Sequence, residues 1–91
     1  MKTLPAAAKA YNRTPLFTNA TVPQALLNDH RTKPGVWGLI QVEHGALEYT
    51  IAGDKTYILT PGNPGVVEPA VTHFVRPVGE TAFFVEFYRA E

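Results

Sequence analysis

The sequence of 91 residues contains no cysteine and no serine. Without cysteine there are no disulfides, iron–sulfur clusters or thiolate metal sites. Without either residue there is no serine or cysteine nucleophile of the kind used in hydrolase triads. A phosphate loop is also missing, because the Pro61–Gly65 turn lacks the lysine, the Ser/Thr hydroxyl and the following helix that such a loop requires. We therefore assign no catalytic residue.

The chain has no excess of charge of one sign and no long apolar run. Eight Lys and Arg balance eight Asp and Glu, for a formal net charge of +0. This balance argues against a nucleic-acid partner, which would require a basic surface. No segment approaches roughly 18 consecutive apolar residues, so we expect no membrane span. The first residues lack the apolar core of a signal peptide. With the absence of cysteine, these features favour a cytoplasmic protein.

No segment shows a ten-residue amphipathic helical pattern, whereas 8 Pro and 7 Gly separate short apolar runs. This punctuation is typical of an all-β domain, and the length suits one domain over residues 1–91. We expect an extended arm over residues 1–24, with an edge strand near 9–12, and one helical turn within 19–27. Seven strands are predicted at residues 26–32, 36–43, 45–52, 55–59, 66–68, 72–76 and 81–89. Such short, closely spaced strands suggest a small sandwich or barrel.

Several motifs resemble the TehB/YeaR-like small cupin family, whose members are similar to the N-terminal domain of the tellurite-resistance protein TehB. The segment His30–Gly38, HRTKPGVWG, resembles the family's His-x-Thr-Lys-x-Gly-x-Trp-Gly motif. Val42–Leu47 resembles the strand–Gly–strand step of cupins, Val67–His73 the second motif, and Phe84–Tyr88 the closing strand. The resemblance implies a cupin-like jelly-roll barrel, a double-stranded β-helix around a pocket. It does not imply methyltransferase activity, because these residues contain no glycine-rich strand–turn–helix for S-adenosylmethionine.

In cupins the pocket often holds a divalent metal, bound by two histidines and a carboxylate of the first motif and one histidine of the second. His30 matches the first of these histidines, and His73 matches the histidine of the second motif. Thr32 stands where the second histidine would be, so that ligand does not carry over. The resemblance therefore implies a site for zinc, iron, nickel or manganese with His30 and His73 as ligands, and His44 or Glu86 as a possible third.

The residues themselves leave other interpretations open. His30 and His73 also suit hydrogen-bonded pocket histidines without a metal, and His44, which precedes a predicted bulge at Gly45, also suits an exposed position. Glu86 lies among aromatic residues, where a carboxylate needs a partner or has a raised pKa.

Most of the aromatic residues are expected to form the core. Trp37, at the pocket mouth in the resemblance, and Tyr49 are candidates to contact a bound cofactor or ligand, together with Glu86.

The leading functional hypothesis is a domain that binds a divalent metal, a small molecule or both in the barrel pocket, with a stress-related role as one option. Whether it is an enzyme stays open. One alternative is a metal-free module that binds a small metabolite or an anion through protonated histidines. Another is a structural interaction protein. The strand predicted at 81–89 is apolar on both faces, which suits either a central strand covered on both sides or an interface. With the common assembly of cupins, this pattern leads us to expect a homodimer.

Overall fold

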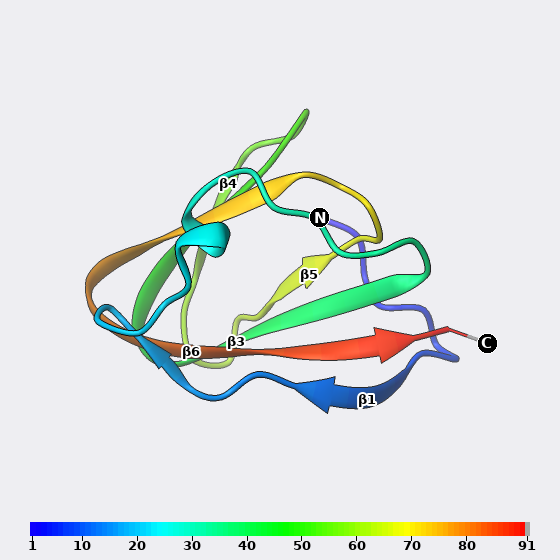
Figure 1. Ribbon diagram of the computed structural model, residues 1–91, viewed down its shortest axis with the longest axis horizontal. Helices are drawn as coiled ribbons and strands as arrows, with labels where there is room; N and C mark the ends of the chain where they lie inside the picture. Colours follow the sequence, from blue (N-terminus) through cyan, green and yellow to red (C-terminus); the bar gives the residue numbers. More distant parts are fainter. Residues whose placement is uncertain (91) are drawn as a thin grey trace.

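The computed structural model describes residues 1–90, which form six strands and one short 3-10 helix (Figure 1). The strands are β1 (Lys9–Arg13), β2 (Phe17–Thr18), β3 (Val36–Ile51), β4 (Thr56–Leu59), β5 (Gly65–Val67) and β6 (His73–Arg89), and the helix is η1 (Gln24–Leu27). Every strand pair is antiparallel. The all-β prediction is therefore confirmed. Within residues 1–90 no helix has the length and apolar character needed to cross a membrane.

Two strands are much longer than the sequence predicted. The predicted strands 36–43 and 45–52 form one strand of 16 residues, β3. Likewise, 72–76 and 81–89 belong to one strand of 17 residues, β6. The two strands pair along their whole length, from Val36 opposite Arg89 to Ile51 opposite His73. The glycine-containing segments that suggested strand ends are bulges within this ladder, where the register shifts between Val42 and Ala46.

The bulges bend the β3–β6 ladder back on itself. Gly45 has a φ of +77°, and a Cβ at this position would clash with the carbonyl oxygen of Glu80. The buried hydroxyl of Thr81 donates a hydrogen bond to the carbonyl oxygen of Ala46 at 2.9 Å. The side-chain oxygen of Asn19, in the arm, accepts a hydrogen bond from the backbone N–H of Thr81 at 2.8 Å. These contacts satisfy backbone groups that the bend removes from the regular ladder.

The sheet has the strand order β1-β6-β3-β4, with β2 also paired to β6 and β5 to β3. The two edge strands lie on different halves of the bent ladder, because β1 pairs with residues 86–89 of β6 and β4 pairs with residues 47–50 of β3. No pairing joins β1 to β4 in the described part of the chain. The sheet is therefore open, and the expectation of a closed barrel is corrected.

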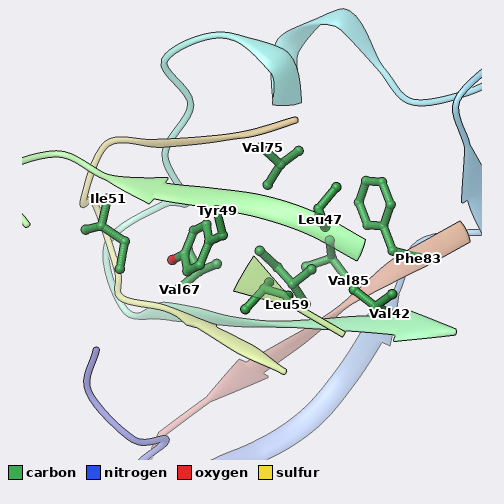
Figure 2. Close-up of a cluster of buried hydrophobic side chains, with 10 residues drawn as sticks. Val42, Leu47, Tyr49, Ile51, Leu59, Val67, Val75, Phe83 and Val85 are labelled. Atoms are coloured by element: carbon green, nitrogen blue, oxygen red, sulfur yellow. The ribbon is translucent and has the colours of Figure 1, made fainter. Parts of the chain in front are cut away.

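The bend brings the inner faces of the two halves together around one core (Figure 2). Because successive side chains point to opposite faces of a strand, every second residue of β3 and β6 enters this core. Its buried members are Ile40, Val42, Leu47, Tyr49, Ile51, Leu59, Val67, Val75, Phe83 and Val85. The sheet thus encloses its apolar surface by folding over.

The arm differs from its prediction in one respect. The edge strand expected near 9–12 is present as β1, and the helical turn expected within 19–27 is η1. The strand predicted at 26–32 is wrong. The N–H of Leu26 donates to the carbonyl oxygen of Pro23 at 3.0 Å, so this backbone closes a local turn instead of a cross-strand ladder. In the described residues, an isolated β-bridge between His30 and His73 pairs the segment after η1 with β6.

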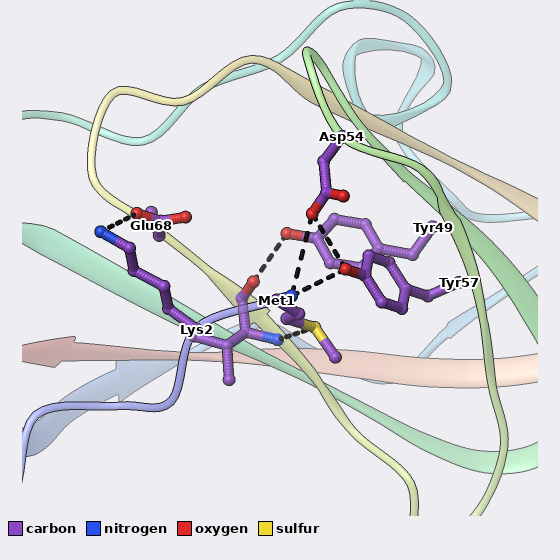
Figure 3. A network of polar contacts seen from close by, with 7 residues as sticks. Met1, Lys2, Tyr49, Asp54, Tyr57 and Glu68 are labelled. Atoms are coloured by element: carbon purple, nitrogen blue, oxygen red, sulfur yellow. Dashed lines mark hydrogen bonds and ion pairs between the residues drawn. The ribbon is translucent and has the colours of Figure 1, made fainter.

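The first residues pack against β4 and the segment after β5 (Figure 3). The amino group of Met1 donates to the hydroxyl of Tyr57 at 2.7 Å. That hydroxyl in turn donates to the Asp54 carboxylate at 2.9 Å. The ammonium of Lys2 lies 3.5 Å from the carboxylate of Glu68. The arm is therefore attached near residue 1 as well as through β1.

Candidate ligand-binding site

A cavity with a volume of about 220 Å³ lies inside the bent sheet, next to η1. Its wall is mainly apolar and comes from β3, β5, β6, η1 and the arm. Phe17 and Leu26 contribute from the arm and η1, and Val67, Phe83 and Phe87 contribute from the strands. The same apolar faces that form the core therefore leave an interior space at this end of the molecule.

His30 and His73 meet at the cavity wall. The backbone N–H of each residue donates to the carbonyl oxygen of the other, at 2.8 and 2.7 Å. In such an antiparallel pair the two side chains extend to the same face. The imidazole rings accordingly lie edge to face, with centroids 5.4 Å apart and an interplanar angle of 79°. Backbone pairing thus places two imidazoles from distant parts of the sequence side by side.

His73 is the more buried histidine, with only 4% of its surface exposed. Burial lowers its pKa below the usual 6.5; the hydrogen bond to Val71 opposes this shift, and the neighbouring His30 adds to it. Nδ1 lies 3.2 Å from the carbonyl oxygen of Val71. A carbonyl can only accept, so Nδ1 carries the proton and Nε2 presents a lone pair. Tyr49 packs against the same ring, with centroids 5.7 Å apart.

Thr32 was considered in the sequence only as the replacement of a metal ligand, but it is part of this wall. Its hydroxyl is buried and donates to the carbonyl oxygen of Val36 at 2.7 Å. The side chain therefore stabilises the loop between η1 and β3 that carries His30. Phe17 and Leu26 were not identified as site residues from the sequence, because nothing local to them indicates which cavity they line.

The other histidine is elsewhere. His44 lies on the exposed bend of β3, where its Nε2 is 3.5 Å from the carboxylate of Glu80 and 66% of its side chain is exposed. The structure therefore brings His30 and His73 together and does not bring His44 to them. Within residues 1–90 no group of three or more His, Cys, Asp or Glu side chains is arranged to hold a metal ion.

The three residues proposed to contact a cofactor lie in different parts of the structure. Tyr49 is buried beside His73, and its hydroxyl donates to the carbonyl oxygen of Val66 at 2.8 Å. Tyr49 does not line the cavity, and neither do Trp37 and Glu86. Trp37 and Glu86 are half-buried on the outer face of the ladder, where the Gln41 amide lies 3.4 Å from the carboxylate of Glu86. Of the six candidate residues, the structure thus gathers His30, His73 and Tyr49.

Comparisons with known proteins place this arrangement in a family. A family model described as the TehB-like domain matches residues 12–85. A protein from E. coli strain K12 superposes with a TM-score of 0.91 at 24% identity, covering 100% of this chain and 99% of that chain. At that identity the likeness shows the fold alone.

TehB from Haemophilus influenzae superposes with a TM-score of 0.84 at 28% identity, covering 93% of this chain but 32% of that chain. The chain therefore spans about a third of that TehB. No curated protein sequence gives a significant match. The family match includes both histidines of the cavity and most of the sheet, and the chain therefore belongs to the TehB-like domain family.

Proposed function

We propose that this domain binds a small molecule in the interior cavity, with the polar group of the ligand at the His30–His73 pair. The observation that carries the proposal is the composition of the cavity wall, which is apolar except for two imidazoles and two threonine hydroxyls. Ligand sites combine apolar walls with a few polar groups that fix orientation. The volume of about 220 Å³ is below the roughly 300 Å³ or more of drug-sized sites, so the ligand is small.

The bent sheet supports a cupin-like jelly roll as the finer description of the fold. The bend divides β3 and β6 into two halves each, and the halves face one another across the core. Two facing antiparallel sheets around an interior space are the layout of a jelly roll. In that layout the cavity corresponds to the interior pocket implied by the family resemblance.

A divalent metal at His30 and His73 is the second candidate. In its favour, Nδ1 of His73 is bonded to a carbonyl oxygen, and Nε2 has no hydrogen-bond partner among residues 1–90, the arrangement typical of a metal-ligating histidine. The described residues supply no third ligand beside the pair, so the chain's own residues do not fit a complete metal site. We therefore place small-molecule binding first and derive no chemistry from a metal.

The test uses protein purified without an affinity tag or chelator. An NMR titration with toluene, as a minimal apolar probe, is expected to shift the backbone amide signals of residues around the cavity. Elemental analysis of the same sample is expected to find metal well below one equivalent. Stoichiometric metal that is lost in His30→Ala and His73→Ala would instead support the second candidate. Metal-free protein with no response to small probes up to millimolar concentration would contradict both.

The homodimer stays a prediction. Phe83 and Val85 of the two-faced apolar segment face the core, whereas Phe84 and Tyr88 are half-buried on the outer face. Size-exclusion chromatography with light scattering would contradict a dimer by showing a clean monomer. The cytoplasmic location likewise stays a prediction.

A further inference from the structure

The donors and acceptors on the cavity wall that have no protein partner limit which chemical class of ligand can bind. The hydroxyl of Thr32 uses its one proton on the carbonyl oxygen of Val36, at 2.7 Å. The hydroxyl of Thr14 donates to the carbonyl oxygen of Pro15 at 2.9 Å and accepts from the N–H of Val85 at 3.0 Å. A hydroxyl has a single proton to donate, so neither threonine has one left for a ligand.

The free donor capacity of the wall therefore lies with the two imidazoles, whereas acceptor capacity remains on the hydroxyl oxygen of Thr32 as well. At His73 the proton is on Nδ1, which faces the carbonyl oxygen of Val71, so Nε2 is an acceptor. Nε2 of His73 has no hydrogen-bond partner within residues 1–90. No fully buried side-chain nitrogen in that range lacks a partner, so Nε2 is not fully buried, and His73 lines the cavity. The His30 side chain makes no hydrogen bond to the described residues and can take either role.

The cavity also lacks a charged side chain. None of its lining residues, all within the described part of the chain, is Lys, Arg, Asp or Glu. A charged ligand would lose its hydration there without an opposite charge to replace it. The wall thus favours an uncharged ligand.

The volume limits the size of the ligand. An engineered apolar cavity of about 150 Å³ in another protein accommodates benzene. A volume of about 220 Å³ therefore suits one six-membered ring with one or two small substituents, or a short chain of similar bulk.

We propose that the ligand is a small, uncharged hydrogen-bond donor with an apolar body, such as a phenol or an alcohol, whose hydroxyl donates to Nε2 of His73. This inference rests on the proposed function and names the ligand class of that same site. His30, next to the acceptor, is placed to donate to the oxygen of the same hydroxyl. Tyr49, packed against the ring of His73, holds that imidazole in position.

The experiment compares three ring compounds of similar size with the full chain, by NMR titration at about pH 7. At that pH 4-methylphenol is uncharged, toluene lacks the hydroxyl, and 4-methylbenzoate is an anion. We expect 4-methylphenol to bind roughly two- to tenfold tighter than toluene, the effect of one hydrogen bond. The anion is expected to bind more weakly than either.

Two variants locate the hydrogen bond. His73→Leu removes the acceptor and should abolish the preference for 4-methylphenol over toluene. His44→Leu, at the exposed histidine of the bend, should leave that preference unchanged. If His73→Leu does not fold, the comparison of the three compounds with the unmodified chain still decides the ligand class.

Each contrary result has a separate meaning. Equal affinity for toluene and 4-methylphenol would overturn the donor assignment and leave the proposed binding function intact. Tightest binding of 4-methylbenzoate would overturn it in favour of an anion held by protonated histidine, again with a binding function. Failure of all three compounds to bind would remove the proposed function itself, and the ligand class with it.

Discussion

The inner and outer faces of the β3–β6 ladder differ sharply, although the same two strands supply both. Phe83 on the inner face is 1% exposed and meets the ring of Phe17 edge to face, with centroids 5.7 Å apart. Its neighbour Phe84 is half-buried on the outer face, with the guanidinium of Arg13 5.1 Å from its ring centroid. Because side chains alternate along a strand, one residue separates core from surface. Position in the pleat, rather than residue type, therefore decides the environment.

The same division runs through the candidate site. His73 and Tyr49 lie on the inner side and contact one another. Trp37 and Glu86 lie on the outer side, and His44 is exposed on the bend. A group on the inner face is desolvated, as His73 and Tyr49 are, whereas a group on the outer face keeps its contact with water. Burial on the inner face lowers the pKa of His73.

The largest expected difference between the faces is at the two adjacent phenylalanines. Phe83→Ala should reduce the free energy of unfolding by about 3–5 kcal/mol, because it removes a fully buried ring and leaves a void. Phe84→Ala should cost about 1 kcal/mol or less, since its ring is half exposed and loses mainly a cation–π contact. Urea unfolding of both variants measures the difference. Similar losses would show that the outer face is also buried, as in a dimer.

A second test breaks the bend that turns one sheet into two facing halves. Gly45→Ala should destabilise the fold by about 3 kcal/mol or more, because its positive φ and a backbone clash with Glu80 act together. Gly79→Ala, at a φ of +65° with open space around the position, should cost only about 1 kcal/mol. Thermal unfolding checks the pair, and equal losses would mean that the bend can shift to admit a Cβ.

Folding should be coupled to pH through His73. Burial places the pKa of His73 in the folded protein below its usual 6.5. Between the folded-state pKa and pH 6.5 the unfolded chain binds more protons than the folded protein, so the free energy of unfolding rises with pH across this window. The contribution is complete above pH 6.5 and is lost as the pH falls through the folded-state pKa. Urea midpoints measured against pH should flatten in His73→Leu and keep their slope in His44→Leu. If the pH dependence of the midpoint is lost in His44→Leu instead, the assignment of this pH dependence to His73 is wrong.

The smallest effect is expected on the outer face. Glu86→Gln should change the free energy of unfolding by less than about 0.5 kcal/mol, because its contact with Gln41 is long and partly exposed. It should leave the binding of 4-methylphenol unchanged, since Glu86 does not line the cavity. Loss of binding in this variant would show that the outer face contributes to the binding site. Circular dichroism and the NMR titration measure the two quantities.

Local patterns predicted much of the secondary structure. The Gly53 turn and the Thr60–Gly65 turn lie where expected, and the bulge at Gly45 is present. Residues 26–32 were predicted as a strand, whereas the N–H of Leu26 closes a local turn within η1. The lengths of β3 and β6 were missed because a glycine that permits a turn also permits a bulge. Which of the two forms depends on the pairing strand.

Only some residues of the candidate site could be selected from the sequence, because their positions also depend on strand pairing. Motif resemblance selected His30 and His73, and the structure places them side by side. The positions of Trp37, Glu86 and His44 could not be inferred. Side chains alternate between the two faces of a strand, and the sequence does not say which of the two sets faces inward until the bend is known. Thr32 and Leu26 entered the cavity wall through loop and helix geometry that local composition does not encode.

By itself, the sequence determined an all-β domain, the absence of thiol and serine nucleophiles, most of the turns and the pair of histidines worth considering. These follow from residue chemistry and from local backbone preferences, which act over a few residues. The tertiary structure alone decided that the sheet bends instead of closing, which face encloses the cavity, and which nitrogen of His73 is available. Those outcomes depend on contacts between residues far apart in the chain, and a one-residue shift in pairing would exchange the two faces.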